Sequence, residues 1–198
     1  MSLPPVFVLD TETTGLCGYP RDRVVDIAIC KVNFDTAKIE EVYSSVVGHD
    51  VDKWDIDQKN AWIFQNTDLK LEDVKNAPPL EEIASDVQDI LKGNVVTSYN
   101  VGFDFRKFLN YNPWKLGLHS HIGPCIMLAA TDICKIPGYG EDYKWPKLQE
   151  AYDLITVDDP VGIKGRQTHR ALSDAVMASW ILLELAAMGV WIHPKEVE

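Results

Sequence analysis

Residues 6–16 read VFVLDTETTGL, an apolar run that ends in two carboxylates. The run Val6–Asp10 predicts a buried strand. Asp10 and Glu12 are two residues apart, so their side chains project to the same side of an extended chain. Two such carboxylates repel each other unless a cation lies between them, and oxygen ligands select hard ions such as Mg²⁺ or Mn²⁺. The alternative is that the Asp and the Glu only flank a turn.

Outward from this strand, apolar periodicity predicts an α/β fold, with a mixed β-sheet flanked by helices. Further strands are predicted at Val24–Val32, Glu41–Val47 and Val95–Tyr99, the first three strands of the chain being antiparallel. Apolar residues at helical spacing between Pro79 and Gly93 predict an amphipathic helix. Other helices are predicted at Phe103–Leu109, Pro124–Ile133, Lys147–Tyr152 and Leu172–Met188. Segment 48–79 is polar and mixed, and one short helix is expected there, around Ala61–Phe64.

Composition bounds the class of protein. With 198 residues and 46% hydrophobic composition, the chain can bury one sizeable core, and we expect a single domain over residues 1–198. A net charge of −11 excludes a broad basic platform for duplex nucleic acid. No signal peptide and no CxxC pair are present, so a cytoplasmic location is expected. The apolar segment Ala175–Ile192 contains Glu184 and is interpreted as a core helix, not a membrane span.

Three more candidate residues lie at strand ends or helix starts. Asp104 follows the predicted strand Val95–Tyr99, and His169 precedes the long C-terminal helix, with Asp174 in its first turn. Each of these residues alone is usually structural, because Asp is a common helix cap. Four carboxylates and one histidine, all at such positions, are harder to explain as caps and favour a metal-dependent site.

Three motifs carry a family resemblance. Residues 8–16 (VLDTETTGL), 98–104 (SYNVGFD) and 169–175 (HRALSDA) resemble, in order and internal spacing, the motifs of the DnaQ-like 3′-to-5′ exonucleases of the DEDDh group. The motifs span most of the chain. The resemblance implies an RNase H-like fold, in which three leading antiparallel strands are followed by alternating helices and strands.

The resemblance also implies a mechanism. Asp10, Glu12 and Asp174 would ligate one metal ion, Asp10 would bridge to a second ion, and Asp104 would hold that second ion. Two Mg²⁺ or Mn²⁺ ions can activate a water and stabilise the leaving oxygen of a phosphoryl displacement. His169 would be the general base, because an imidazole titrates near the operating pH. The product would be a nucleoside 5′-monophosphate released from a 3′ end.

Substrate-binding residues are assigned from the same resemblance. The turn after the first motif would seat the terminal nucleotide, next to lining residues of the second motif. Cationic residues beside His169 either contact the phosphates of a single strand or belong to a solvated loop. The candidates are Thr13, Gly15, Leu16, Asn100, Phe103, Arg166 and Arg170.

The expected function is therefore hydrolysis of single-stranded DNA or RNA from the 3′ end. Two forms stay open, a stand-alone trimming enzyme and a proofreading subunit whose polymerase partner is encoded elsewhere. A catalytically silent nucleic-acid-binding protein of the same fold is a further alternative, as is a hydrolase of a small phosphodiester. The intact set of acidic residues argues against a silent protein. Membrane association is not expected, and a homodimer is an open question because dimers are common among stand-alone relatives.

Overall fold

The computed structural model describes residues 3–140, 142–156, 160, 162, 165 and 167–194. These residues form a five-stranded sheet in the order β3-β2-β1-β4-β5. The strands are β1 (Val6–Thr13), β2 (Val24–Asn33), β3 (Lys38–Val46), β4 (Val95–Ser98) and β5 (His121–Ile122). β1, β2 and β3 pair antiparallel, whereas β4 pairs parallel with both β1 and β5. The predicted mixed sheet with three leading antiparallel strands is confirmed.

β1 is central because it is apolar on both faces. Its first four residues are buried, as a strand covered on both sides requires. In the pairing with β2, Asp10 lies opposite Ala28 and Glu12 opposite Asp26, and the register shifts between Glu12 and Thr13. The polar C-terminal end of β1 therefore lies next to Asp26, a polar residue of β2. The helices η2 and α9, on opposite faces of the sheet, begin near this end of β1.

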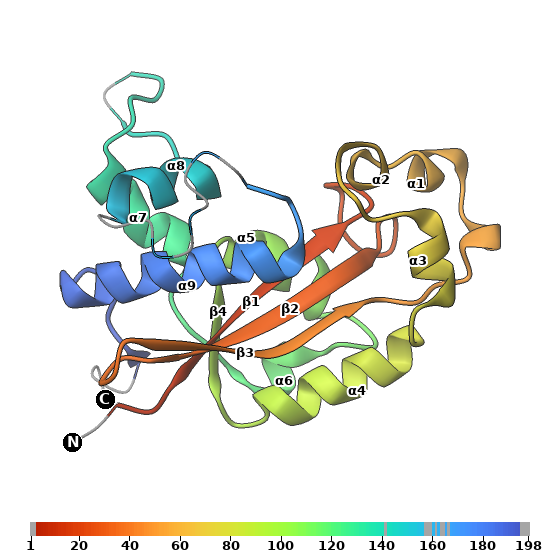
Figure 1. The fold of residues 1–198 in the computed structure, drawn as a ribbon, viewed down its shortest axis with the longest axis horizontal. Helices are drawn as coiled ribbons and strands as arrows, with labels where there is room; N and C mark the ends of the chain where they lie inside the picture. Colours follow the sequence, from red (N-terminus) through yellow and green to blue (C-terminus); the bar gives the residue numbers. More distant parts are fainter. Residues whose placement is uncertain are drawn as a thin grey trace.

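One face of the sheet is covered by α7 (Ile126–Cys134), α8 (Leu148–Ile155) and α9 (Ala171–Ala187). Figure 1 shows α9 running along this face, across β1 and β2. Small residues at the start of α9, Ala171 and Ala175, pack on Ala28 and Cys30 and allow the helix to approach the sheet closely. The interpretation of this segment as a core helix is confirmed by this packing. Among the described residues, no helix is both long and apolar enough to cross a membrane.

The opposite face is covered by α4 (Leu80–Leu91), α5 (Val101–Phe103), η2 (Asp104–Leu109) and α6 (Leu116–His119). Figure 1 shows α4 and α6 below the strands, on the side away from α9. The predicted helix Phe103–Leu109 is a single α-turn followed by a π-helical segment, in which the Asn110 N–H donates to the Phe105 carbonyl at 2.9 Å. π-Helical turns often occur at functional sites.

Segment 48–79 holds more structure than the single expected helix. It contains η1 (Val51–Lys53), α1 (Ile56–Lys59), α2 (Trp62–Asn66) and α3 (Leu71–Asn76). Apolar side chains of these elements form a small cluster around Val25, Trp54 and Val74. Elements of three to six residues are too short to show a period, and the capping box between Asp55 and Gln58 supplies local stability instead. For the same reason, α6 and β5 were not predicted.

Candidate active site

The predicted catalytic residues converge on one cavity at the end of β1. The cavity has a volume of about 200 Å³. It lies where β1, the start of η2 and the start of α9 meet, and Asn100 and Phe103 of the second motif also contribute to its wall. The predicted catalytic residues in the wall are Asp10, Glu12, Asp104, His169 and Asp174.

Asp104 is held in the cavity by β1 itself. The Thr11 hydroxyl donates to Asp104 Oδ1 at 2.6 Å, and the Asp104 side chain is only 3% exposed. The capping role belongs to another residue, because Asn100 Oδ1 accepts the N–H of Phe103 at 3.1 Å at the start of α5. Interpreting Asp104 as the cap of this helix is therefore wrong. The Asp104 carboxylate belongs instead to the wall of the cavity.

Asp174 is fixed by two neighbours in the first turn of α9. Gln167 Nε2 donates to Asp174 Oδ2 at 2.5 Å, and the Ser173 hydroxyl donates to Oδ1 at 3.0 Å. The N-cap position of α9 is Arg170, and Asp174 lies four residues later inside the first turn, so Asp174 is not the N-cap residue. Gln167 was not predicted as a site residue, since its sequence neighbourhood gives no signal of this contact.

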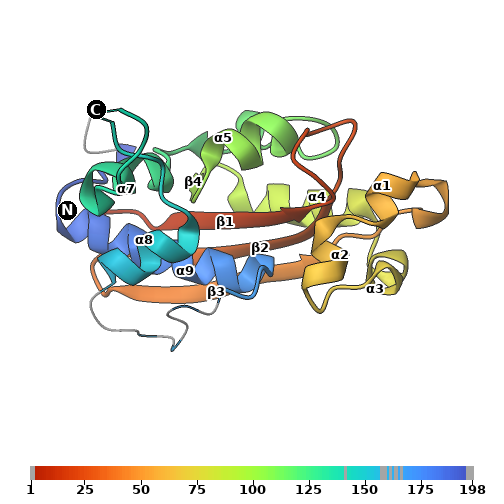
Figure 2. The same ribbon diagram turned by 90° about the horizontal axis from the view of Figure 1, so that it is seen from above.

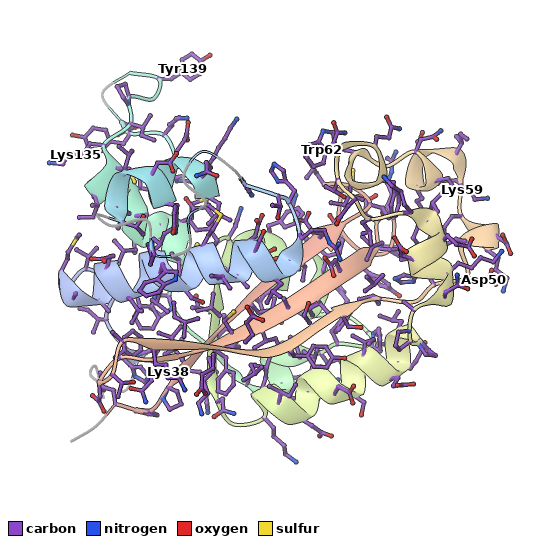
Figure 3. The ribbon with its side chains drawn as sticks, viewed as in Figure 1. Lys38, Asp50, Lys59, Trp62, Lys135 and Tyr139 are labelled. Carbon is purple, nitrogen blue, oxygen red and sulfur yellow. The ribbon has the colours of Figure 1, made fainter. Side chains whose placement is uncertain are left out.

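His169 lies just before α9 with a left-handed backbone, at φ 54°. One ring nitrogen of His169 and carboxylate oxygens of Glu12 and Asp174 lie within 4.8 Å of one another. The imidazole ring makes an edge-to-face contact with Trp62, at 5.0 Å between ring centroids. Trp62, labelled in Figure 3, begins α2 in the segment whose role the sequence did not reveal.

The four carboxylates are strained electrostatically as a group. Burial raises the pKa of Glu12 to about 9 and that of Asp104 to about 6. Burial and then the charge of Asp104 raise the pKa of Asp10 well above its usual range, and burial raises the pKa of Asp174. Among the described residues, no lysine or arginine forms an ion pair with any of the four. An oxygen-rich set with one imidazole and no direct ion pair to a described lysine or arginine fits a divalent metal ion.

The turn after β1 lies outside this cavity wall. The Thr13 hydroxyl donates to the Gly15 carbonyl at 2.8 Å, and the Leu16 side chain is 74% exposed. A Cβ on Gly15 would lie 2.6 Å from Asp22 Oδ1, and the same Asp22 carboxylate accepts the Cys17 N–H at 2.7 Å. Glycine is therefore required here by the approach of Asp22. The assignment of Thr13, Gly15 and Leu16 as nucleotide contacts stays a prediction.

Arg170 is held by two carboxylates. Its Nε lies 2.7 Å from Asp26 Oδ2, and its Nη1 lies 2.9 Å from Asp68 Oδ1. Asp26, 2% exposed, also accepts the N–H of Ala171 at 3.2 Å. This contact was not predicted, although an Asp inside the apolar strand β2 indicates a buried partner. Arg166, the other cation assigned to phosphate binding, lies outside the described residues.

Comparison with known proteins gives a family. The model of an exonuclease family, RNase T, matches residues 7–182. The chain is 28% identical over 180 residues to the 3′-5′ exonuclease DinG of Bacillus subtilis, an alignment covering 90% of this chain and 17% of that protein. It is 25% identical over 178 residues to a PolC-type DNA polymerase III of Caldanaerobacter subterraneus, covering 90% and 11%. The chain therefore spans less than a fifth of either relative.

Solved structures show the same fold. A full-length 3′-exonuclease matches with a TM-score of 0.66 at 15% identity, covering 98% of this chain and 66% of that one. E. coli Exonuclease I in complex with a dA16 oligonucleotide matches with a TM-score of 0.63 at 12% identity, covering 93% and 41%. These matches confirm the predicted RNase H-like α/β fold. Because the family model extends from β1 into α9 and so includes all three motifs, the predicted resemblance is confirmed, and the chain belongs to the RNase T family of exonucleases.

Proposed function

We propose that the chain is a metal-dependent 3′-to-5′ exonuclease, acting as a single exonuclease domain on single-stranded nucleic acid. The reaction would hydrolyse the phosphodiester bond at the 3′ end and release a nucleoside 5′-monophosphate. The observation that carries the proposal is the convergence of four carboxylates and one imidazole, from three distant parts of the chain, on one cavity. Clustering acidic groups that no described cation pairs costs stability, so the cluster is expected to serve the chemistry.

In this proposal the residues of the cavity have two roles, metal ligand and general base. Asp10, Glu12, Asp104 and Asp174 would hold two Mg²⁺ or Mn²⁺ ions, which supply an activated water and neutralise charge at the scissile phosphate. His169 would accept the proton of the attacking water. Gln167 and Thr11 act through their hydrogen bonds, which fix the orientation of Asp174 and Asp104. Asn100 and Phe103 line the space available to the terminal nucleotide.

The names of similar proteins support the substrate class without choosing the sugar. Exonuclease I was solved with a DNA oligonucleotide, and another structural neighbour is a 3′-exonuclease solved for recognition of a histone mRNA stem-loop, with a TM-score of 0.63. The PolC-type relatives favour a second candidate, a proofreading unit working with a polymerase. Hydrolysis by the isolated chain distinguishes the stand-alone form from one that needs a polymerase.

The test is hydrolysis of single-stranded DNA and RNA oligonucleotides, labelled at either end, with Mg²⁺, Mn²⁺ or EDTA. We expect mononucleotides to be released from the 3′ end only when a divalent ion is present. Asp10→Ala should lower the rate by about three orders of magnitude or more, because an ion at the reacting phosphate supplies several kcal/mol. Asp89→Ala, an exposed position of α4 on the far face, is the matched control.

Three results would contradict the proposal. They are release from the 5′ end, activity that persists in EDTA, and an Asp10→Ala variant as active as Asp89→Ala. The role of His169 is tested in parallel by Mn²⁺ binding measured with EPR. His169→Ala should lower the rate and keep the Mn²⁺ affinity, whereas equal loss of affinity in His169→Ala and Asp174→Ala would make His169 a ligand.

A further inference from the structure

A continuous surface of aromatic and cationic side chains leads away from the catalytic cavity. We call it the aromatic strip. It is built from the β1–β2 connection and from the segment around η2, two parts of the chain that Figure 2 shows side by side, in red and green. Its members are Phe103, Lys107, Leu16, Tyr19, Tyr111 and Arg23.

The strip starts inside the cavity. Phe103 contributes to the cavity wall, and Lys107 Nζ lies 5.5 Å from the centroid of the Phe103 ring. The same ammonium donates to the Leu16 carbonyl at 2.7 Å. Lys107 therefore joins the motif that holds Asp104 to the turn that follows Glu12, and it places an exposed positive charge next to the space for the terminal nucleotide.

The strip continues through two tyrosines. The Tyr19 N–H donates to the Lys107 carbonyl at 2.9 Å, and the Tyr19 ring stacks on the Tyr111 ring with 5.5 Å between centroids and 25° between planes. The guanidinium carbon of Arg23 lies 5.8 Å from the Tyr19 ring centroid. Tyr19 and Tyr111 are 44% and 45% exposed, so ring surface stays open to a ligand.

The charge of these two segments is opposite to that of the whole chain. The chain carries −11, yet both charged members of the strip are positive, the exposed Lys107 and the half-buried Arg23. The acidic residues of the two segments are withdrawn from this surface, because Asp22 accepts the Cys17 N–H and Asp104 accepts the Thr11 hydroxyl. Cations interleaved with exposed aromatic rings are the chemistry that binds a single strand, since rings stack on bases and cations contact phosphates.

We propose that the aromatic strip binds the nucleotides that precede the 3′-terminal nucleotide of a single strand. Tyr111 stacks on a base, Tyr19 holds the Tyr111 ring in place, and Lys107 and Arg23 contact phosphates. The proposal rests on the proposed function, because it takes the cavity beside Phe103 as the position of the 3′ end. The affinity of the protein for a single strand should then increase with strand length. This dependence does not require hydrolysis at the carboxylates.

Binding is measured by fluorescence anisotropy of a twelve-nucleotide oligothymidylate labelled at its 5′ end, in CaCl₂ and with strand integrity checked on a gel. Tyr111→Ser should raise Kd at least about five-fold, and Tyr111→Phe, which keeps the ring, should stay near wild type. Lys107→Met should reduce the slope of log Kd against log salt by about 0.7, the value for one phosphate contact on a single strand. The controls are Tyr139→Ser and Lys135→Met, two exposed positions that Figure 3 shows on the opposite side of the view from the β1–β2 connection.

Hydrolysis separates this proposal from the proposed function. In the same variants, the KM ratio of variant to wild type should grow as the oligonucleotide is lengthened from two to twelve nucleotides. One outcome is that Tyr111→Ser and Lys107→Met have the same Kd, salt slope and KM as the controls. This outcome would contradict the proposal for the aromatic strip and would not affect the proposed exonuclease function. Weakened binding in a chain that hydrolyses nothing would support the strip and reject the exonuclease. A wild type that binds no oligonucleotide would overturn the strip.

Discussion

The buried Asp26 and the four acids of the cavity are neighbours, and they are partnered in different ways. Asp26 of β2 lies opposite Glu12 of β1 in the sheet register. Asp26 is paired with Arg170, and this contact lowers a pKa that burial raises. Glu12 and the other acids of the cavity raise one another's pKa values, and the charge of Arg170 offsets only part of this at Glu12. The chain therefore gives Asp26 a direct ion pair, whereas none of the four cavity acids has such a pair among the described residues.

This difference separates a stabilising contact from a catalytic one. A buried ion pair is costly to break because the remaining charge has no partner. A cluster of unpaired carboxylates is costly to keep, and it persists only where something else is gained. Removing a charge from the Asp26–Arg170 pair should consequently destabilise the protein. Removing the charge of Glu12 should instead stabilise the metal-free protein.

The largest effect on stability is expected from Arg170→Met. This change leaves the buried Asp26 without its cation and should lower the free energy of unfolding by about 2–3 kcal/mol. Urea unfolding measures it, and Asp26→Asn combined with Arg170→Met should recover part of the loss. Arg106→Met, an exposed position of η2, is the control. If Arg170→Met costs no more than the control yet weakens oligonucleotide binding, Arg170 is a phosphate contact.

Glu12→Gln should act in the opposite direction. The folded pKa of about 9 is raised above the ordinary 4.5, so the folded state retains a proton that the unfolded state loses. The stability that this group contributes is fully present below pH 4.5 and is lost as pH rises toward 9. In EDTA at pH 8, Glu12→Gln should therefore raise the free energy of unfolding by about 1–2 kcal/mol, and flatten its dependence on pH.

Added Mg²⁺ distinguishes this explanation from a general effect of charge. Mg²⁺ should raise the Tm of wild type and reduce the advantage of the variant, because the ion binds the folded carboxylates. Glu81→Gln, an exposed position of α4, should change neither the pH dependence nor the response to Mg²⁺. A Glu12→Gln protein less stable than wild type in EDTA would contradict the electrostatic account of the cavity.

The smallest effect is expected from Trp62→Ala, which should lower kcat only modestly. Segment 48–79 contacts both parts of the comparison, the Asp26–Arg170 pair and the cavity. Asp68 of this segment contacts Arg170, whereas Trp62 contacts His169. An aromatic contact contributes roughly 0.5–1.5 kcal/mol, so losing the one that orients His169 should lower kcat about two- to ten-fold. KM and Mn²⁺ affinity should stay unchanged, and Trp62→Phe should restore most of the rate. In a His169→Ala background, Trp62→Ala should have no effect; a persisting effect would mean that Trp62 acts elsewhere.

Long elements could be predicted because their side chains repeat with a period. β2 and α4 were placed within a few residues, and β1 extends beyond the predicted Asp10 because Thr13 still pairs with Val24. The change from α5 to the π-helical η2 has no sequence signal, since it depends on how Phe105 and Leu109 pack under the sheet. In segment 48–79 the helix expected around Ala61–Phe64 is α2, whereas η1, α1 and α3 were missed because each has too few apolar residues.

The candidate site could be predicted as far as local motifs reach. All five predicted catalytic residues lie around one cavity, although their roles stay predictions. The partners of those residues were not predictable, because the contacts cross long distances along the chain. Trp62 with His169 and Thr11 with Asp104 are such pairs, and neither Trp62 nor Thr11 could be identified as a partner from its place in the sequence.

The parallel pairing of β1 with β4 sets the order in which the site can be completed during synthesis. Asp10 and Glu12 are synthesised before Asp104, and Asp104 can join them only after β4 has inserted beside β1. Asp174 arrives later still, with α9. Such non-local pairing is slow compared with helix formation. A nascent chain that has made β1, β2 and β3 therefore holds two of the four acids, and the cavity is complete only when α9 has packed on the sheet.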